Sequence, residues 1–333
     1  MMRGLNTEQK QIVTEHRIWC KQLIEAVSHG KPEPRAPLSF ILGSAGVGKS
    51  HIIRLIQQDS IKLLRYLPHV SPDDVLCMLT APTGTAAFNI DGMTIHSALS
   101  LGAFFHTLGT SRLNTLQSKL SKLRVLVIDE VSMVGSDMLY QIHDRLDAIK
   151  GTAGDPYKVF GNVSVIAVGD LFQLKPVKQP FVFDKPSKAL AQLCPLWDSF
   201  QLKELTQVMR QKDDKLFAEI LNRVRTANCT RSDIQVLKER ELKCEFGHPK
   251  YPEDALHVYV NKHGVKKHDE RMMKKLEEKH TQKYVLKSCD SKRDKHTSQV
   301  TIELSDNPSN TGGLEKTLEI AKGAHVMLSL IHI

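Results

Sequence analysis

Four apolar runs, each ending near a glycine or a carboxylate, constrain the fold of this chain most strongly. The runs LSFIL, VLCMLT, VLVIDE and VSVIAVGD are followed by GSAGVGKS, APTGTAAFNI, VSMVGSDMLYQIHDRL and LFQLKPV. Runs that are apolar at nearly every position predict strands buried on both faces of a parallel sheet, with helices crossing between them. The sequence therefore predicts an α/β fold whose ligands bind at the carboxyl ends of the strands.

The segment GSAGVGKS matches the phosphate-loop pattern GxxxxGK[ST] and lies between the strand-like LSFIL and the helix-like HIIRLIQQ. Backbone N–H groups of such a loop surround phosphate oxygens, Lys49 adds a positive charge at the β- and γ-phosphates, and Ser50 can hold Mg²⁺. A chance match is disfavoured because both flanking elements are present. The candidate nucleotide-binding residues are Gly43, Ser44, Ala45, Gly46, Val47, Gly48, Lys49 and Ser50.

The run VLVIDE supplies a second candidate catalytic group at a strand end. Asp129 can hold the metal, and Glu130 can orient or deprotonate the attacking water. A pair of acidic residues after an apolar strand is usually a solvated strand end. Together with the phosphate loop, it predicts hydrolysis of ATP or GTP with Mg²⁺.

Two further strand ends allow two interpretations each. In VSVIAVGDLFQLKPV, Gln173 can sense the γ-phosphate or the hydrolytic water, but a turn stabilised by Asp170 explains the pattern equally well. In APTGTAAFNIDGMTIHSAL, Thr83, Gly84, Thr85 and His96 can contact a second anion such as a nucleic-acid backbone. A helix cap and a buried histidine are equally good explanations of that segment.

The composition limits the class of protein that this chain can be. The chain of 333 residues is 41% hydrophobic and 25% charged, which is typical of a soluble globular protein of about two domains. No apolar stretch approaches the ~20 residues of a membrane helix, and the start has no secretory signal. The net charge of +9 fits a polyanion partner and also a merely basic protein. Six scattered cysteines predict free thiols in a reducing compartment.

The motifs, in this order, resemble the Pif-type (petite integration frequency) DNA helicases of superfamily one, including Helitron-type helicase regions. The resemblance covers the chain from Leu5 to about Met327 and rests on LNTEQ, GSAGVGKS, APTGTAAFNIDGMTIHS, VLVIDEVSM, VGDLFQLKPV, LTQVMRQKDDKLFAEILNRVR and ALHVYVNKHGVKKHDERMM. It implies that Gln9, otherwise a capping-box residue with Asn6, reads adenine, which makes ATP the fuel. It also implies that Gln173 couples to the γ-phosphate, that Arg210 reaches that phosphate, and that the segment of Thr85 and His96 meets single-stranded DNA.

The resemblance further implies tandem RecA-like domains, with the second one incomplete. We expect an N-terminal helical segment at residues 1–36, a first RecA-like domain at 37–200, a small wedge-type insertion at 98–123, and a partial second domain at 201–327. Such a protein would be a monomeric motor moving 5′ to 3′ on single-stranded DNA and opening forks in repair, recombination, replication or telomere maintenance. The expected location is the nucleus, and also the mitochondrion.

The last residues of the chain suggest a truncated sequence. The apolar run from His325 to Ile333 falls where the family continues into further segments with a second ATP-facing arginine, so we expect a truncated sequence. Residues 328–333, LSLIHI, are expected to be a non-native tail, because CTG TCT CTT ATA CAC ATC, the start of a transposase end sequence used in preparing sequencing libraries, encodes them. An inactive nucleotide- and DNA-binding relic of a helicase or mobile element is the alternative to an active motor.

Overall fold

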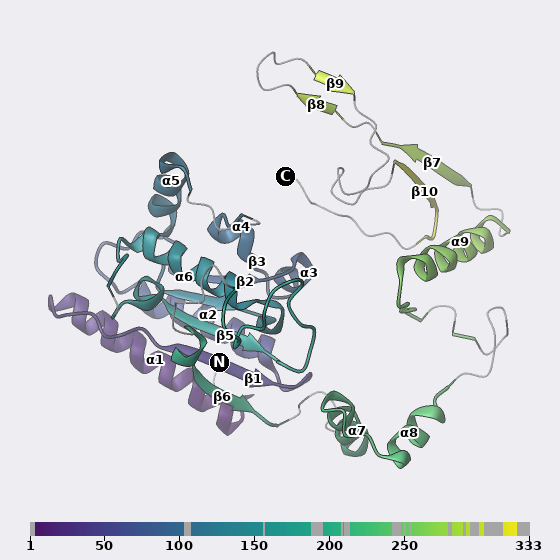
Figure 1. Cartoon of the computed structure of the whole chain (residues 1–333), viewed down its shortest axis with the longest axis horizontal. Helices are drawn as coiled ribbons and strands as arrows, with labels where there is room; N and C mark the ends of the chain where they lie inside the picture. The colour runs from purple at the N-terminus through teal and green to yellow at the C-terminus, as the bar shows by residue number, and fades with distance from the viewer. Residues whose placement is uncertain are drawn as a thin grey trace. The chain divides into compact units, whose positions relative to one another are not determined.

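The computed structural model describes most of the chain in two compact units, residues 1–241 and 242–333. The described residues are 4–102, 108–155, 157–187, 196–207, 209, 214–241, 248, 251–252, 255–278, 282–288, 291–293, 300–302 and 316–324. Figure 1 labels the helices and strands of both units.

A six-stranded parallel sheet forms the centre of the first unit, as the sequence predicted. The strands lie in the order β3-β2-β4-β5-β1-β6, and every pairing between neighbours is parallel. Their bounds are β1 (Leu38–Gly43), β2 (Cys77–Ala81), β3 (Met93–Thr94), β4 (Val125–Ile128), β5 (Ser164–Gly169) and β6 (Gln201–Leu205).

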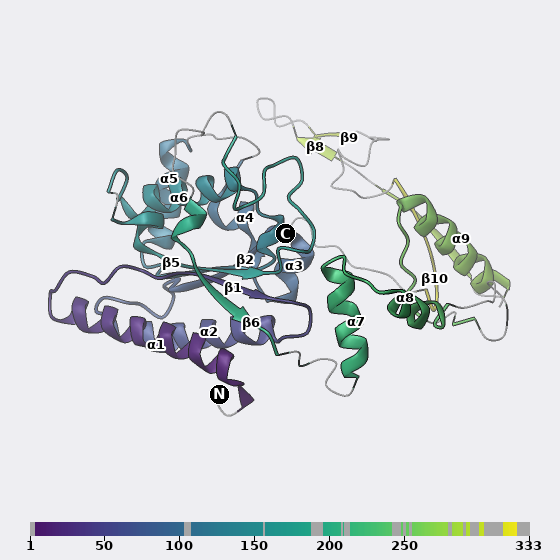
Figure 2. The same cartoon turned by 60° about the horizontal axis from the view of Figure 1, so that its bottom comes forward.

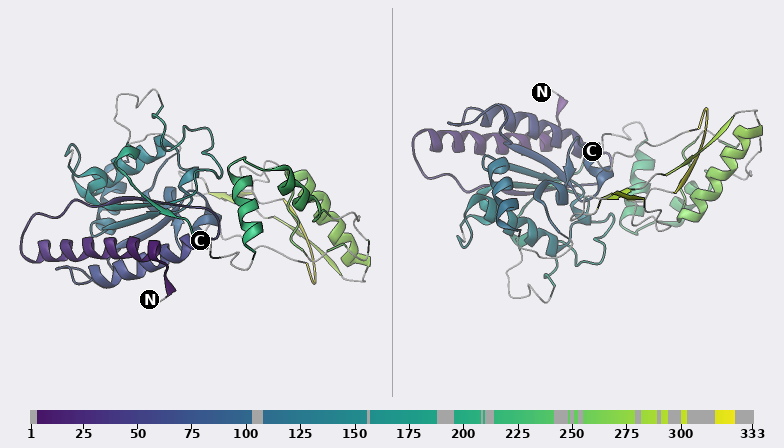
Figure 3. Two further views of the ribbon diagram at one scale, coloured as in Figure 1. Left: turned by 90° about the horizontal axis from the view of Figure 1, so that it is seen from below. Right: turned by 90° about the horizontal axis from the view of Figure 1, so that it is seen from above.

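Helices cover both faces of this sheet, which explains why its central strands are apolar at nearly every position. Figure 2 shows α1 and α2 on one side of the sheet and α5 and α6 on the other, and both views of Figure 3 show the same layers. The helices of the sheet domain are α1 (Thr7–Ser28), α2 (Lys49–Leu64), α3 (Gly84–Asn89), α4 (Ile95–Leu99), α5 (Thr110–Leu120) and α6 (Ser136–Lys150), with 3₁₀ turns η2 (Val131–Met133), η3 (Val159–Asn162) and η5 (Leu196–Ser199).

A hydrophobic core lies on each face of the sheet, and alternate residues along a strand belong to one core or the other. In β4, Val125 and Val127 pack with α1 and α2, whereas Leu126 and Ile128 pack with α5 and α6. This alternation follows from the two-residue period of a strand, whose side chains point to opposite faces. All four residues are fully buried.

The boundary that we expected at residue 200 differs from the structure. β6 pairs in parallel with β1, from Ser39 opposite Gln201 to Gly43 opposite Leu205, and so completes the first sheet. α1 is joined to the same strand, because Glu15 binds Lys203 and the Glu8 carboxylate accepts the Thr206 backbone N–H at 2.9 Å. The first unit therefore includes the expected N-terminal segment, residues 1–36. It also includes residues 201–241, which we expected in the second domain.

The expected insertion at 98–123 is largely integral to the sheet domain. Leu99, Leu116, Leu120 and Leu123 are buried in the core shared with α6. Its function as a wedge stays a prediction.

Two short helices, α7 (Lys215–Arg225) and α8 (Arg231–Lys238), complete the first unit. Arg223 of α7 forms a two-bond ion pair with Asp233 of α8, with N–O distances of 2.7 and 2.7 Å. The Asp233 carboxylate also accepts the backbone N–H of Thr230 at 2.9 Å in a capping box. These bonds fix α8 against α7.

The second unit contains a long helix and two antiparallel strand pairs. β7 pairs with β10, β8 pairs with β9, and Lys283 joins Glu277 and Glu319 at 3.1 and 2.8 Å. The bounds are α9 (Lys262–Glu278), β7 (Lys283–Lys287), β8 (Ser291–Arg293), β9 (Val300–Ile302) and β10 (Thr317–Ala321). α9 has no buried residue and is a surface helix.

The segment ALHVYV, whose alternating apolar residues are typical of a strand, is not a strand in the second unit. Residues 255–260 form no strand, and Leu256, Val258 and Val260 are almost completely exposed. A parallel second RecA-like sheet therefore stays a prediction, and the expected tail at 328–333 lies outside the described residues. Within the described ranges, every helix is too short or too polar to cross a membrane.

Candidate active site

The candidate catalytic groups gather at one edge of the first sheet. Because all six strands run in the same direction, their carboxyl ends share that edge. Along the strand order, the edge carries His96 after β3, Thr83 to Thr85 after β2, Asp129 and Glu130 after β4, Asp170 and Gln173 after β5, and the phosphate loop after β1.

The phosphate loop, residues 43–50, has the backbone shape that its glycines predict. Gly46 and Gly48 have φ values of +87° and +88°, in the left-handed region that residues with a Cβ avoid. Gly48 precedes the first residue of α2, and Ser50 is exposed in the first turn of that helix. Free N–H groups at a helix start favour an anion, so the loop geometry fits a phosphate group.

Gln9 joins the first helix to this loop. Its side-chain amide donates to the Val47 carbonyl at 3.0 Å, and its amide oxygen accepts the Asn6 N–H at 3.2 Å in the predicted capping box. The residue is only 3% exposed. Gln9 therefore positions the loop, while its contact with adenine stays a prediction.

Lys49 is held against its own loop in an acidic environment. Its ammonium group donates to the carbonyls of Gly43 and Ser44 at 2.8 and 3.0 Å. Burial lowers the pKa of Lys49, whereas the charges of Glu130, Asp170 and Asp129 act to raise the pKa. The three carboxylates, which follow β4 and β5, therefore lie near the amine that follows β1.

Asp129 is a buried carboxylate, and a bound cation would stabilise its negative charge. The residue is 6% exposed, and burial raises the pKa of Asp129 to about 6. Carboxylate and hydroxyl oxygens are ligands that Mg²⁺ accepts, so Asp129 and Ser50 fit this metal. Among the described residues, no group of three or more His, Cys, Asp or Glu side chains forms a metal cluster.

Glu130 directly follows Asp129 in a strained conformation. Its φ and ψ angles are 51° and 47°, a left-handed geometry that is uncommon for a residue with a side chain. Strain of this kind is concentrated at functional sites, where surrounding structure maintains it. The role of Glu130 in orienting water stays a prediction.

The turn after β5 confirms the interpretation of its sequence as a turn stabilised by Asp170. Asp170 accepts the Phe172 backbone N–H at 3.2 Å and the Gln173 side-chain amide at 3.4 Å. Asp170 therefore stabilises the turn, and Gln173 is exposed at the edge beside the phosphate loop. Contact between Gln173 and a γ-phosphate stays a prediction.

Arg225 is a residue of the site that sequence reasoning missed. Its guanidinium binds the Asp170 carboxylate at 2.6 and 2.7 Å, and its charge also affects Lys49. Only the position of Arg225 at the end of a helix pattern was visible in the sequence.

Arg210, the expected γ-phosphate arginine, lies outside the described residues. Its neighbour Met209 donates a backbone N–H to the Gly46 carbonyl at 2.8 Å. The chain therefore reaches the phosphate loop one residue before Arg210, and the role of Arg210 stays a prediction.

The candidate DNA-contacting residues lie at the other end of the edge. Thr83 caps α3 by accepting the Ala86 N–H at 3.2 Å, so the cap interpretation is confirmed. Gly84, Thr85 and His96 are exposed, which excludes the interpretation of His96 as a buried histidine. Exposure leaves these residues accessible, and contact with DNA stays a prediction.

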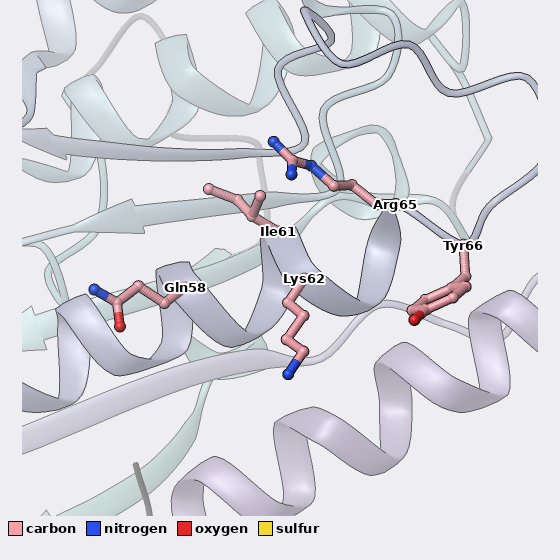
Figure 4. Close-up of a pocket in the computed structure, with 5 residues that line it drawn as sticks. All are labelled: Gln58, Ile61, Lys62, Arg65 and Tyr66. Carbon is pink, nitrogen blue, oxygen red and sulfur yellow. The ribbon is translucent and has the colours of Figure 1, made fainter.

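A separate depression of about 410 Å³ lies far from this edge. Figure 4 shows its five side chains projecting from the last turns of α2 and the residues that follow, and they are Gln58, Ile61, Lys62, Arg65 and Tyr66. A helix that follows a strand runs back across the sheet, so these turns lie toward the opposite edge. The depression has no carboxylate among its lining residues and includes none of the candidate catalytic groups, so we do not consider it a candidate active site.

The sheet and its phosphate-loop edge define the chain as a P-loop protein with a RecA-like fold. The chain belongs to the PIF1-like helicase family, whose model matches residues 4–234. The ATP-dependent DNA helicase PIF1 of Emericella nidulans is 35% identical to this chain over 218 residues, 62% of this chain and 27% of that protein.

Two solved structures have the same fold. The Pif1 helicase from Candida albicans has a TM-score of 0.64 at 24% identity, covering 97% of this chain and 64% of that chain. A Bacteroides Pif1 helicase in complex with ADP-AlF3 and single-stranded DNA has a TM-score of 0.56 at 23% identity, covering 86% and 60%. The chain spans about a quarter of the length of three curated relatives that it matches.

Proposed function

We propose that this chain is the ATP-hydrolysing part of a DNA helicase that moves on single-stranded DNA and opens duplex ahead of it. The observation that supports this function most directly is the convergence on Lys49 of the charges of Asp129, Glu130 and Asp170. Asp170 follows β5, the neighbour of β1, and Asp129 and Glu130 follow β4, the next strand along, so the fold assembles these groups at one edge of the sheet. Membership of the PIF1-like helicase family supports the same function.

In this proposal each residue has a defined task. The N–H groups of the loop and Lys49 bind the phosphates, and Asp129 with Ser50 holds Mg²⁺, which neutralises charge on the phosphates when bound. Glu130 orients the attacking water and accepts its proton, since it directly follows the metal-binding residue. Gln173 and Arg210 contact the γ-phosphate, and Gln9 contacts adenine.

Single-stranded DNA is the proposed partner, and forked DNA the proposed place of action. Thr85 and His96 are exposed beside β2 and β3, and a Bacteroides relative of the same fold binds single-stranded DNA. Monomeric action and a nuclear or mitochondrial location are parts of the proposal that rest on the family resemblance.

The decisive experiment measures ATP hydrolysis by the 333-residue chain with and without an oligothymidine strand. We expect hydrolysis to rise several-fold with DNA and to be lost in Lys49→Ala, because that substitution removes the charge at the phosphates. Lys62→Ala is the matched control, since Lys62 lies exposed on the same helix at its far end and should leave hydrolysis unchanged.

Two results would contradict the proposal. Hydrolysis that does not respond to DNA would exclude a DNA motor, and ATP binding without any hydrolysis would favour the nucleotide-binding relic. DNA affinity supplies a second check, because the logarithm of the binding constant should fall with the logarithm of salt concentration by about 0.7 per phosphate contacted. Affinity that is insensitive to salt would exclude tracking along the backbone.

A further inference from the structure

The ion pair between Asp170 and Arg225 is the best-formed charged contact at the catalytic edge. Nε donates to Oδ2 at 2.6 Å and Nη2 donates to Oδ1 at 2.7 Å, across a sequence separation of 55 residues. The Asp170 side chain is 1% exposed and the Arg225 side chain 21%. Two parallel charge-assisted bonds fix the orientation of both groups as well as their distance.

The same carboxylate also organises the turn that carries Gln173. Oδ1 accepts the Phe172 N–H at 3.2 Å, Oδ2 accepts the Gln173 side-chain amide at 3.4 Å, and the Gln173 N–H binds the Asp170 carbonyl at 2.9 Å. Arg225 and Gln173 are therefore joined through a single, buried carboxylate. A shift of the guanidinium must change the geometry of the turn.

Arg225 itself is held rigidly at the end of α7. Its guanidinium lies 4.5 Å from the centre of the Phe172 ring, and Nη1 donates to Asn222 Oδ1 at 3.3 Å within the same helix. Ile220 is the only buried residue of α7. The charged end of this helix is consequently a main contact between α7 and the sheet edge.

The pair also sets the local charge near the phosphate loop. Burial raises the pKa of Asp170, but the bonds from Arg225 and from the Phe172 N–H outweigh burial and leave the pKa below its ordinary value. Without Arg225, an unpaired buried carboxylate would remain close to Lys49. Removing one partner of a buried pair is more damaging than removing both, because the remaining charge is left uncompensated.

We propose that Arg225 is a positioning residue of the nucleotide site. It holds the Asp170 turn, and through this turn Gln173, in place beside Lys49. The placement of Gln173 then depends on how α7 is seated against the sheet, which links the hydrolytic edge to a helix outside the sheet. The inference rests on the proposed ATP hydrolysis for its effect on rate.

The test compares Arg225→Ala with Arg223→Ala in the full chain. Both arginines lie on α7 and form two-bond pairs with a buried aspartate, but Arg223 pairs with Asp233 of α8. For Arg225→Ala we expect kcat for DNA-stimulated hydrolysis to fall roughly 10- to 100-fold, as for a misplaced catalytic group. KM for ATP should change by less than about threefold, because the loop N–H groups and Lys49, which the substitution does not remove, supply most of the proposed phosphate contacts.

Amide hydrogen exchange gives a readout that needs no enzyme activity. In Arg225→Ala, a peptide covering residues 170–175 should exchange several times faster than in the wild type, while a peptide covering residues 43–50 should be unchanged. Arg223→Ala should leave both peptides unchanged. Arg225→Lys keeps the charge but loses the two-bond geometry, so it should give an intermediate rate and intermediate exchange.

Unchanged kcat and unchanged exchange at 170–175 in Arg225→Ala would overturn the inference, as would an equal effect of Arg223→Ala. If Arg225→Ala does not fold, Arg225→Lys decides the question by the same exchange measurement. If the wild type hydrolyses no ATP, the proposed function fails, while the exchange comparison still decides whether Arg225 positions the turn.

Discussion

Asp129 is a candidate catalytic residue whose burial opposes the stability of the fold. Burial raises the pKa of Asp129 from 3.8 to about 6. A carboxyl group with a raised folded-state pKa contributes most stability below its unfolded pKa, and this contribution is lost as the pH rises to about 6. At neutral pH the cost is about 3 kcal/mol at most.

The first prediction follows from this cost. Asp129→Asn should increase the free energy of unfolding at pH 7.5 by about 1–3 kcal/mol, because the amide is uncharged, and it should abolish hydrolysis. Thermal unfolding and ATPase assays measure the two effects. Glu130→Gln is the control, since it should lose hydrolysis and keep binding of Mg²⁺ with ATP. A less stable Asp129→Asn variant would contradict the prediction.

Gly48 provides the second prediction at the scale of a residue. Its φ of +88° disfavours any side chain, and an added Cβ would lie 2.9 Å from Gln9 Nε2. Gly48→Ala should therefore lower the free energy of unfolding by about 1–3 kcal/mol and weaken ATP binding. Gly109→Ala is a matched control, because a Cβ there meets nothing within 4 Å. Chemical denaturation of both variants would check the difference.

Residues whose role depends on local spacing could be predicted from sequence, whereas those that depend on distant partners could not. GSAGVGKS and VLVIDE contain their own context of strand, loop and helix, so the phosphate loop and Asp129 were recognised. Arg225 pairs with a residue 55 positions earlier, and no local pattern identifies that partner. Gln9 was recognised as a cap, but its bond to Val47 required the packing of α1 against the loop.

At the scale of elements, the contact between α1 and α2 contains a titratable group with a defined protonation state. Ser60 Oγ donates to the Ile56 carbonyl at 2.6 Å, so its contact with His16 Nε2 at 2.8 Å requires His16 to donate. His16 is therefore a neutral ring with its proton on Nε2. Burial lowers the pKa of His16 to about 4.

The third prediction concerns acid stability of this helix pair. Because the folded pKa lies below the unfolded value of 6.5, His16 stabilises the fold above pH 6.5, and this stability is lost as the pH falls toward 4. The loss amounts to about 3 kcal/mol. His16→Gln keeps a donor for Ser60 without titrating, so its unfolding free energy should fall less between pH 6.5 and 4. Parallel pH profiles of the two proteins would contradict this expectation.

Elements that are buried on both faces were predicted better than those at an edge. β4 and β5 are apolar throughout and were identified correctly. β6 has the sequence QLKEL and pairs on one side only, so its exposed polar positions gave no signal of a buried strand. ALHVYV alternates as a strand does, but a strand needs a partner, and the described residues supply none.

For the whole molecule, the division at residue 241 yields the fourth prediction. A fragment of residues 1–241 should fold cooperatively and bind ATP, because it keeps the complete sheet, Arg225 and the bonds from α1 to β6. A fragment of residues 1–200 should be markedly less stable, since it exposes the edge of β1 and leaves Glu15 without Lys203.

Circular dichroism and thermal melting of the two fragments would measure this difference. Equal melting temperatures would show that β6 adds nothing to the first unit. A fragment 1–241 that fails to fold would place the boundary elsewhere.

The strand order also sets the distance between the phosphate loop and the candidate DNA-contacting residues. Between the ends of β1 and β2 lie β5 and β4, so three inter-strand spacings of about 4.8 Å separate the phosphate loop from Thr83 by roughly 14 Å. Hydrogen bonds join these strands into one sheet. Asp170 and Asp129 follow the two strands that lie between the phosphate loop and Thr83. We therefore expect a displacement of the phosphate loop to be transmitted through the sheet, and α7, which is bonded to the sheet edge through Arg225 and Asp170, to move with it.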